Sequence, residues 1–186
     1  MERFAPVRRK TWGILLGLLL AVPLLGQPAA RSYSDGHGGT VAFPLGDLSF
    51  ADEIVGFQSG NPAATHEGDR IPDEALGPPD YDAGADDNYL TLGCGGVLTL
   101  RFTNNVLTDR PGPDLYVFEI GPAVEPTRLW ISRDGEHWLD VGEIAGGRAD
   151  VDISGVARKG DFFYVSPRRT PGCAGWVFVA GLGDGS

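Results

Sequence analysis

The chain has 186 residues, 42% of them hydrophobic, and is acidic: 25 Asp and Glu stand against 15 Lys and Arg, giving a formal net charge of −10 at pH 7. An acidic surface repels polyphosphate, which argues against nucleic acid as a partner. The acidity is typical of a well-solvated exported protein, and divalent-cation binding is the alternative interpretation.

The first thirty residues have the pattern of a secretory signal peptide. A leucine-rich apolar run of about fourteen residues, 12–25, follows a basic segment that contains Arg3, Arg8, Arg9 and Lys10. This run is shorter than the roughly 20 residues that span a bilayer, so a membrane anchor is the weaker interpretation. We predict cleavage near Ala29 or Ala30, no stable membrane insertion afterwards, and a periplasmic, cell-surface or secreted product.

The predicted mature chain has one domain. Residues 31–40 are polar and rich in glycine, which predicts a flexible tail, and residues 41–186 form a single domain with one core. Removing residues 1–30 leaves a net charge near −13. The sequence gives no indication of the oligomeric state.

Period-two alternation of apolar side chains predicts about ten short strands. These are expected at 41–43, 53–57, 88–92, 96–103, 114–120, 127–132, 137–144, 148–153, 161–165 and 176–182. Residues 114–120 carry apolar side chains on both faces, which predicts a central strand buried on two sides. The turn-rich connections are too short for helical crossovers, so we expect an antiparallel, all-β sandwich or barrel.

Residues 131–138 have the pattern of a β-hairpin. Asp134-Gly135 supplies the left-handed residue that the turn requires, and Trp138 is expected to cap the core on the return strand. His137 lies beside Glu136 in this turn. A solvated surface histidine is the favoured interpretation, and a base or metal ligand is the alternative.

The long connection 59–87 contains prolines that exclude a central strand, with one capped helical turn expected at 73–77. Its acidic end offers enough oxygen donors for calcium, which takes six to eight. The predicted ligands are Asp80, Asp82, Asp86, Asp87 and Asn88. The alternative is a turn in which these side chains bond their own backbone.

Cys94 and Cys173 are the two cysteines of the chain. In an oxidising compartment such a pair predicts a disulfide, and the glycines around both residues favour turns. Two buried thiols are the alternative interpretation.

No known catalytic signature is present: there is no G-x-S-x-G, H-E-x-x-H, C-x-x-C or phosphate loop. Glu119 lies within the expected central strand, where we expect an ion pair with Arg101 or Arg128. A polysaccharide hydrolase that uses Glu119, Glu125 and the acidic loop is an alternative function.

Four segments resemble a family of exported bacterial cell-surface proteins: residues 75–80 (ALGPPD), 92–96 (LGCGG), 112–119 (GPDLYVFE) and 132–138 (S-x-D-G-x-x-W). This family is similar to galactose-binding-like, discoidin-type jelly-roll sandwiches, and related stretches occur ahead of OmpA-like domains. The resemblance spans about residues 45–165. It implies a jelly-roll fold, binding of glycans or other surface ligands through loops at one end, and often a structural calcium ion.

The last strand departs from this family, because Cys173-Ala174-Gly175 replaces an acidic Pro-Gly-Ala-Asp-Ile-Asp-like segment. A calcium site on that strand is therefore not expected, and neither is the peptidoglycan partner of an OmpA-like domain. The expected function is an exported, non-catalytic module that binds a cell-envelope or extracellular ligand, most naturally carbohydrate. The predicted ligand-binding residues are Tyr81, Tyr89, Asn104 and Asn105. A structural envelope protein without a small ligand is a further alternative.

Overall fold

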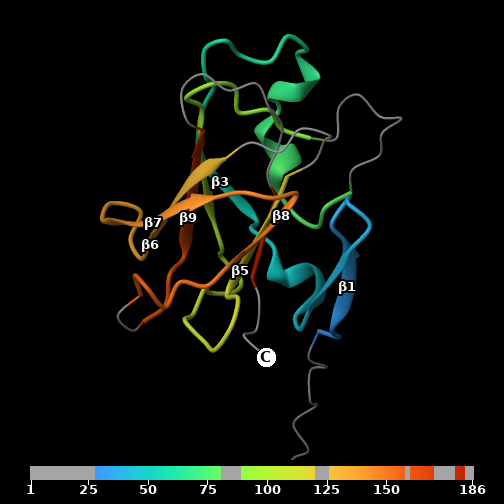
Figure 1. Cartoon of the computed structure of the whole chain (residues 1–186), viewed down its shortest axis with the longest axis vertical. Coiled ribbons are helices and arrows are strands. Elements are labelled where there is room, and N and C mark those ends of the chain that lie inside the picture. Colours follow the sequence, from blue (N-terminus) through green and yellow to red (C-terminus); the bar gives the residue numbers. More distant parts are fainter. Residues whose placement is uncertain (1–27, 81–88, 120–125, 158–159, 170–178, 183–186) are drawn as a thin grey trace, which may run out of the picture.

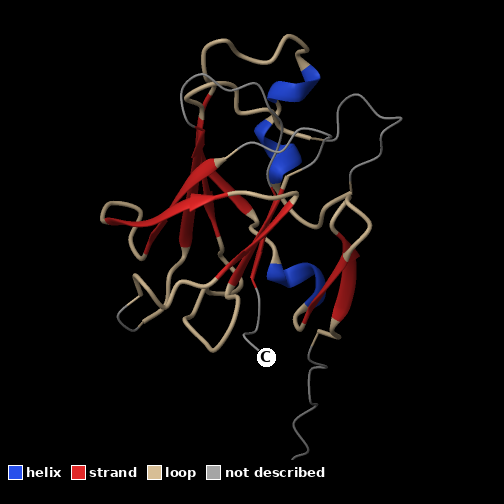
Figure 2. Cartoon of the chain, in the orientation of Figure 1, coloured by secondary structure: helices blue, strands red, loops and turns tan. Residues whose placement is uncertain are grey.

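The structure is a computed structural model that describes residues 28–80, 89–119, 126–157, 160–169 and 179–182. Within these ranges the chain is all-β, and its helices are short 3-10 turns (Figure 2). None of the helices in the described ranges is long and apolar enough to cross a membrane.

The described strands form three antiparallel sheets. The smallest pairs β1 (Arg31–Ser34) with β2 (Thr40–Phe43). The second has the order β10 (Val179–Leu182), β5 (Leu115–Phe118), β8 (Arg148–Val151). The third has the order β3 (Glu53–Gln58), β4 (Val97–Arg101), β9 (Tyr164–Arg169), β6 (Thr127–Ser132), β7 (Trp138–Ile144). The 3-10 turns are η1 (Gly46–Ser49), η2 (Gly68–Arg70) and η3 (Pro72–Ala75).

The second and third sheets face one another across the main core. Leu98 and Leu100 of β4 and Ile131 of β6 pack in one cluster with Leu115 and Val117 of β5. Alternation along each strand turns the intervening side chains outward. The result is the sandwich-like arrangement seen in Figure 1, and the predicted all-β, antiparallel class is confirmed.

The predicted central strand is confirmed, and it separates two cores. Leu115 and Val117 face the main core, whereas Phe118 packs with Phe43 and Phe50 on the other side of β5. The rings of Phe43 and Phe50 lie 4.9 Å apart between centroids. Each aromatic ring buries a large apolar area, so β5 has apolar contacts on both faces.

The β1–β2 hairpin replaces the flexible tail predicted for residues 31–40. Tyr33 is buried and meets the Phe50 ring edge-on, with 4.9 Å between centroids. Its pKa is raised to about 12, first by burial and then by its hydrogen bond to Asp47. Tyr33, pairing with β2 and the ion pair of Arg31 with Asp47 hold this segment in place, and these contacts cannot be read from its polar composition.

Residues 89–92 are not a strand, contrary to the prediction for 88–92. Leu90 and Leu92 are nonetheless buried in the main core. The apolar pattern of this segment therefore arises from burial and not from strand pairing. β9 begins at Tyr164, three residues later than the predicted start at Asp161.

The β6–β7 hairpin is confirmed. Ser132 pairs with Trp138, and Gly135 has a φ of 77°, a left-handed conformation that glycine adopts without strain. Trp138 does not cap the core as predicted. It lies on the outer face of the sheet, where its ring meets that of Tyr164 edge-on at 6.5 Å.

Candidate functional site

Several predicted site residues lie outside the described ranges. These are Tyr81, Asp82, Asp86, Asp87, Asn88 and Cys173. Asp80 is described and exposed. Cys94 is half-buried, and its predicted partner is among the residues outside the described ranges. The calcium site at 80–88 and the Cys94–Cys173 disulfide therefore stay predictions.

The other predicted ligand-binding residues have different surroundings. Tyr89 is 8% exposed and packs in the main core, which leaves little of its ring for a sugar to stack on. Asn104 is exposed, whereas the Asn105 side-chain amide donates a hydrogen bond to the Leu48 carbonyl. Asn105 therefore ties its loop to η1.

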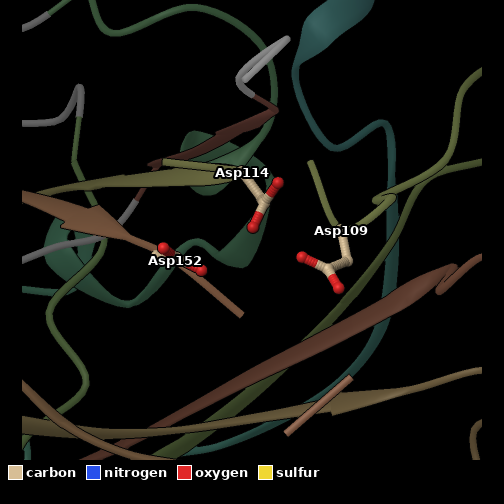
Figure 3. Close-up of side chains that lie close together, drawn as sticks. All are labelled: Asp109, Asp114 and Asp152. Carbon is tan, nitrogen blue, oxygen red and sulfur yellow. The ribbon is translucent and has the colours of Figure 1, made fainter. Parts of the chain in front are cut away.

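Three carboxylates gather where β5 begins and β8 ends. Each of Asp109, Asp114 and Asp152 offers an oxygen, and these oxygens all lie within 4.8 Å of one another (Figure 3). We call these residues the acidic cluster. Asp109 comes from the loop after β4, so three separate segments of the chain meet here.

Asp114 holds this end of the fold together. It is 1% exposed, and its two carboxylate oxygens accept the backbone N–H of Arg110 at 2.7 Å and of Ile153 at 3.0 Å. Burial raises the pKa of Asp114, and its negative neighbours Asp109 and Asp152 add to the rise, while the two N–H donors oppose it.

The acidic cluster supplies three of the six to eight oxygens that calcium takes. Both oxygens of Asp114 already accept backbone hydrogen bonds, and Asp152 accepts the N–H of Ser154 at 2.9 Å. These hydrogen bonds explain the acidic cluster by its role in holding the loops in place. A bound cation would need further ligands from water or from backbone carbonyls.

A pocket of about 300 Å³ lies beside the turn of the β6–β7 hairpin. Its lining combines three polar residues of the hairpin with three apolar residues, Leu139, Val156 and Phe162. We call this the hairpin pocket. Phe162 is buried and Leu139 is 40% exposed, so the apolar lining runs from the core to the surface.

Asp134 and His137 form one side of the hairpin pocket. Asp134 accepts the backbone N–H of Glu136 and of His137, and its Oδ2 lies 2.8 Å from Nδ1 of His137. The backbone N–H of His137, followed by the His137 ring, lowers the pKa of Asp134. The hydrogen bond to Asp134 raises the pKa of His137.

Arg133 forms another side of the hairpin pocket. Its guanidinium carbon lies 5.0 Å from the Phe162 ring centroid, a cation–π contact. A Cβ at Gly160 would come within 2.8 Å of this guanidinium, so the absence of a side chain there makes room for it. Among the described residues no carboxylate is ion-paired with Arg133.

Two groups of the hairpin, the His137 imidazole and the Ser132 hydroxyl, are of the types that can act as a base or a nucleophile. The side chain of His137 is 86% exposed, which leaves its Nε2 edge in solvent. The nearest hydroxyl in the hairpin, that of Ser132, is buried and donates to the His137 carbonyl at 2.7 Å. It is therefore engaged in holding the turn and is not presented as a nucleophile.

Sequence reasoning predicted the hairpin and favoured a solvated surface histidine at His137. It did not single out Arg133, Val156 or Phe162. They come from two loops that only the folded chain brings together.

Comparisons of this chain with protein-family models, with curated proteins and with solved structures found no match. The resemblance to exported cell-surface proteins therefore stays a prediction.

Proposed function

We propose that this chain is an exported, non-catalytic binding module of jelly-roll type that recognises a carbohydrate at the hairpin pocket. The observation that carries the proposal is the lining of that pocket. An apolar floor with a few well-placed polar groups is the usual composition of a small-ligand site, and about 300 Å³ is at the small end of the range for such sites.

The lining matches the two faces of a sugar. Leu139, Val156 and Phe162 offer apolar contact to ring C–H groups. Arg133 offers only hydrogen-bond donors, and ionised Asp134 offers only acceptors. A sugar hydroxyl can therefore accept from Arg133 or donate to Asp134. Asp134 is held by two backbone N–H groups, which fixes its carboxylate before a ligand arrives.

Export, the signal peptide at 1–30 and the jelly-roll connectivity are part of this proposal. They are supported by the basic and apolar pattern of residues 1–25 and by the four segments that resemble exported cell-surface proteins. We also propose a structural calcium ion held by the segment from Asp80 to Asn88. This part of the proposal does not depend on carbohydrate binding at the hairpin pocket. The alternative of a polysaccharide hydrolase has no comparable pocket observation behind it.

The test is a glycan-array screen of the mature chain, followed by calorimetric titration of each glycan that binds. Arg133→Gln should raise the Kd about tenfold, the loss expected for one charge-assisted hydrogen bond. The matched control is Arg110→Gln, because Arg110 is also exposed and follows β4 in a loop outside the pocket lining. Equal effects of the two variants, or release of shortened glycan on incubation, would contradict the proposal.

A further inference from the structure

The outer face of the five-stranded sheet carries three rows of side chains that run across its strands. One row contains Val97, Arg168, Arg128 and Glu143, which are opposite one another in register on β4, β9, β6 and β7. A second contains Glu53, Arg101, Tyr164, Ser132 and Trp138. Between them runs a row that includes Gly56, Thr99, Ser166, Trp130 and Asp140.

The two flanking rows each include an arginine that lies over an aromatic ring. The guanidinium carbon of Arg168 lies 4.4 Å from the Trp130 ring centroid, and that of Arg101 lies 5.4 Å from the Tyr164 ring centroid. The Nε atoms of Arg168 and Arg101 are buried and have no hydrogen-bond partner in the described part of the chain, so a guanidinium over a ring would bind an anion through its terminal NH₂ groups. In the middle row, Ser166 is fully buried and its hydroxyl donates to the Leu98 carbonyl at 2.9 Å.

The charge on this face is uneven. Arg128 and Arg168 are directly opposite on neighbouring strands, an unfavourable pairing of like charges. Arg128 is neutralised by Asp140, whose two oxygens lie 3.1 and 3.0 Å from its Nε. Arg168, by contrast, has no ion-paired carboxylate among the described residues.

On the side away from Arg128, the register partner of Arg168 is neutral. Its neighbour on β4 is Val97, which pairs in turn with Gln58 of β3. The acidic residues of the face, Glu53, Asp140 and Glu143, lie on the two outermost strands. A narrow anionic chain over the centre of the sheet can therefore reach the arginines while avoiding the edges.

We propose that this face binds a carboxylated polysaccharide, with a uronate carboxylate at Arg168 and the sugar chain running lengthwise over the three central strands β4, β9 and β6. A guanidinium and a carboxylate match in planar, two-pronged geometry. Trp130, Tyr164 and Trp138 are partly exposed aromatic rings beside this path, where pyranose rings can pack. The inference does not depend on the hairpin pocket, because the two sites share no residue.

The acidity of the chain favours this ligand over a membrane or a nucleic acid. An extended anionic surface would meet Glu53, Asp140 and Glu143 together with the arginines. A single polysaccharide strand meets only the central strip.

The experiment titrates the mature chain with polygalacturonate and, separately, with the same polymer after full methyl esterification, which removes the charge and keeps the sugar. Polygalacturonate should bind, with a Kd that rises with salt, and the ester should bind at least tenfold more weakly. Arg168→Gln should raise the Kd about tenfold, and Arg168→Lys should give an intermediate loss. Arg133→Gln, in the hairpin pocket, should leave it unchanged.

Arg31→Gln is the matched control, because Arg31 is also an arginine over an aromatic ring, 5.5 Å from the Tyr33 centroid, but on β1. The Tm of each variant checks folding, and Arg168→Lys keeps the test decisive if the glutamine variant is unstable. Equal losses for Arg31→Gln and Arg168→Gln would overturn the proposal. So would equal binding of polymer and ester, or tighter binding to anionic lipid vesicles or single-stranded DNA than to polygalacturonate.

Discussion

Replacing Asp114 by asparagine should destabilise the folded chain by about 1–3 kcal/mol at pH 7, because one of its two backbone N–H donors, of which that of Ile153 is buried, loses its acceptor. Asp114 accepts the N–H of Arg110 and of Ile153 through separate oxygens. The asparagine amide has one oxygen and would place its NH₂ group against the other donor. Asp114→Ala removes both acceptors and should cost more, about 2–6 kcal/mol.

Urea unfolding in excess chelator measures these differences as shifts of the midpoint at constant m-value. Asp109→Asn is the control, since it removes a neighbouring charge but leaves the Asp114 acceptor of both N–H groups in place, and it should change stability by no more than about 0.5 kcal/mol. A midpoint for Asp114→Asn equal to that of the unmodified chain would refute the role given to this carboxylate.

The pH dependence adds a second readout. The pKa of Asp114 is raised in the folded chain, so folding favours its protonated form. The contribution of this titration to the free energy of unfolding therefore falls as the pH rises from the unfolded-state pKa, about 4, through the folded-state pKa. Asp114→Asn should lack this component of the stability profile.

Three further outcomes are expected. Phe43→Ala should lower the free energy of unfolding in urea by about 3–5 kcal/mol, because the ring is fully buried among aromatic side chains. Leu48→Ala, at an exposed position, should change it little. Similar losses for the two variants would contradict the second core. An NMR titration should place the pKa of His137 above its usual 6.5, and Asp134→Asn should return it there. The associated stabilisation is present below about pH 6.5 and is lost as pH rises through the folded pKa. Millimolar calcium should raise the Tm by several degrees over chelator, and an unchanged Tm would refute the calcium proposal.

Much of the fold follows from local pattern. The alternation in residues 127–132 and the Asp134-Gly135 turn predict β6 and its hairpin because both depend on neighbours in sequence. The run at 115–118, which is apolar on both faces, likewise predicts a central strand from residues that are neighbours in sequence.

The rest depends on contacts between distant segments. Arg31–Ser34 is a strand because Tyr33 finds Phe43 and Phe50, and Leu90 is buried without a strand partner. The candidate site shows the same limit. The sequence predicted the turn that holds His137, but Phe162 meets Arg133 only after the sheets have assembled.

The most direct test of carbohydrate recognition at the hairpin pocket is a set of amide chemical-shift maps of the ¹⁵N-labelled mature chain, recorded during titration with each glycan that binds in the array. We expect the largest shifts at residues 133–139, 156 and 160–162, which surround the pocket. The same shifts should be absent with Arg133→Gln at equal ligand concentration. Shifts confined to the 59–92 connection, with the hairpin unchanged, would contradict recognition at this pocket.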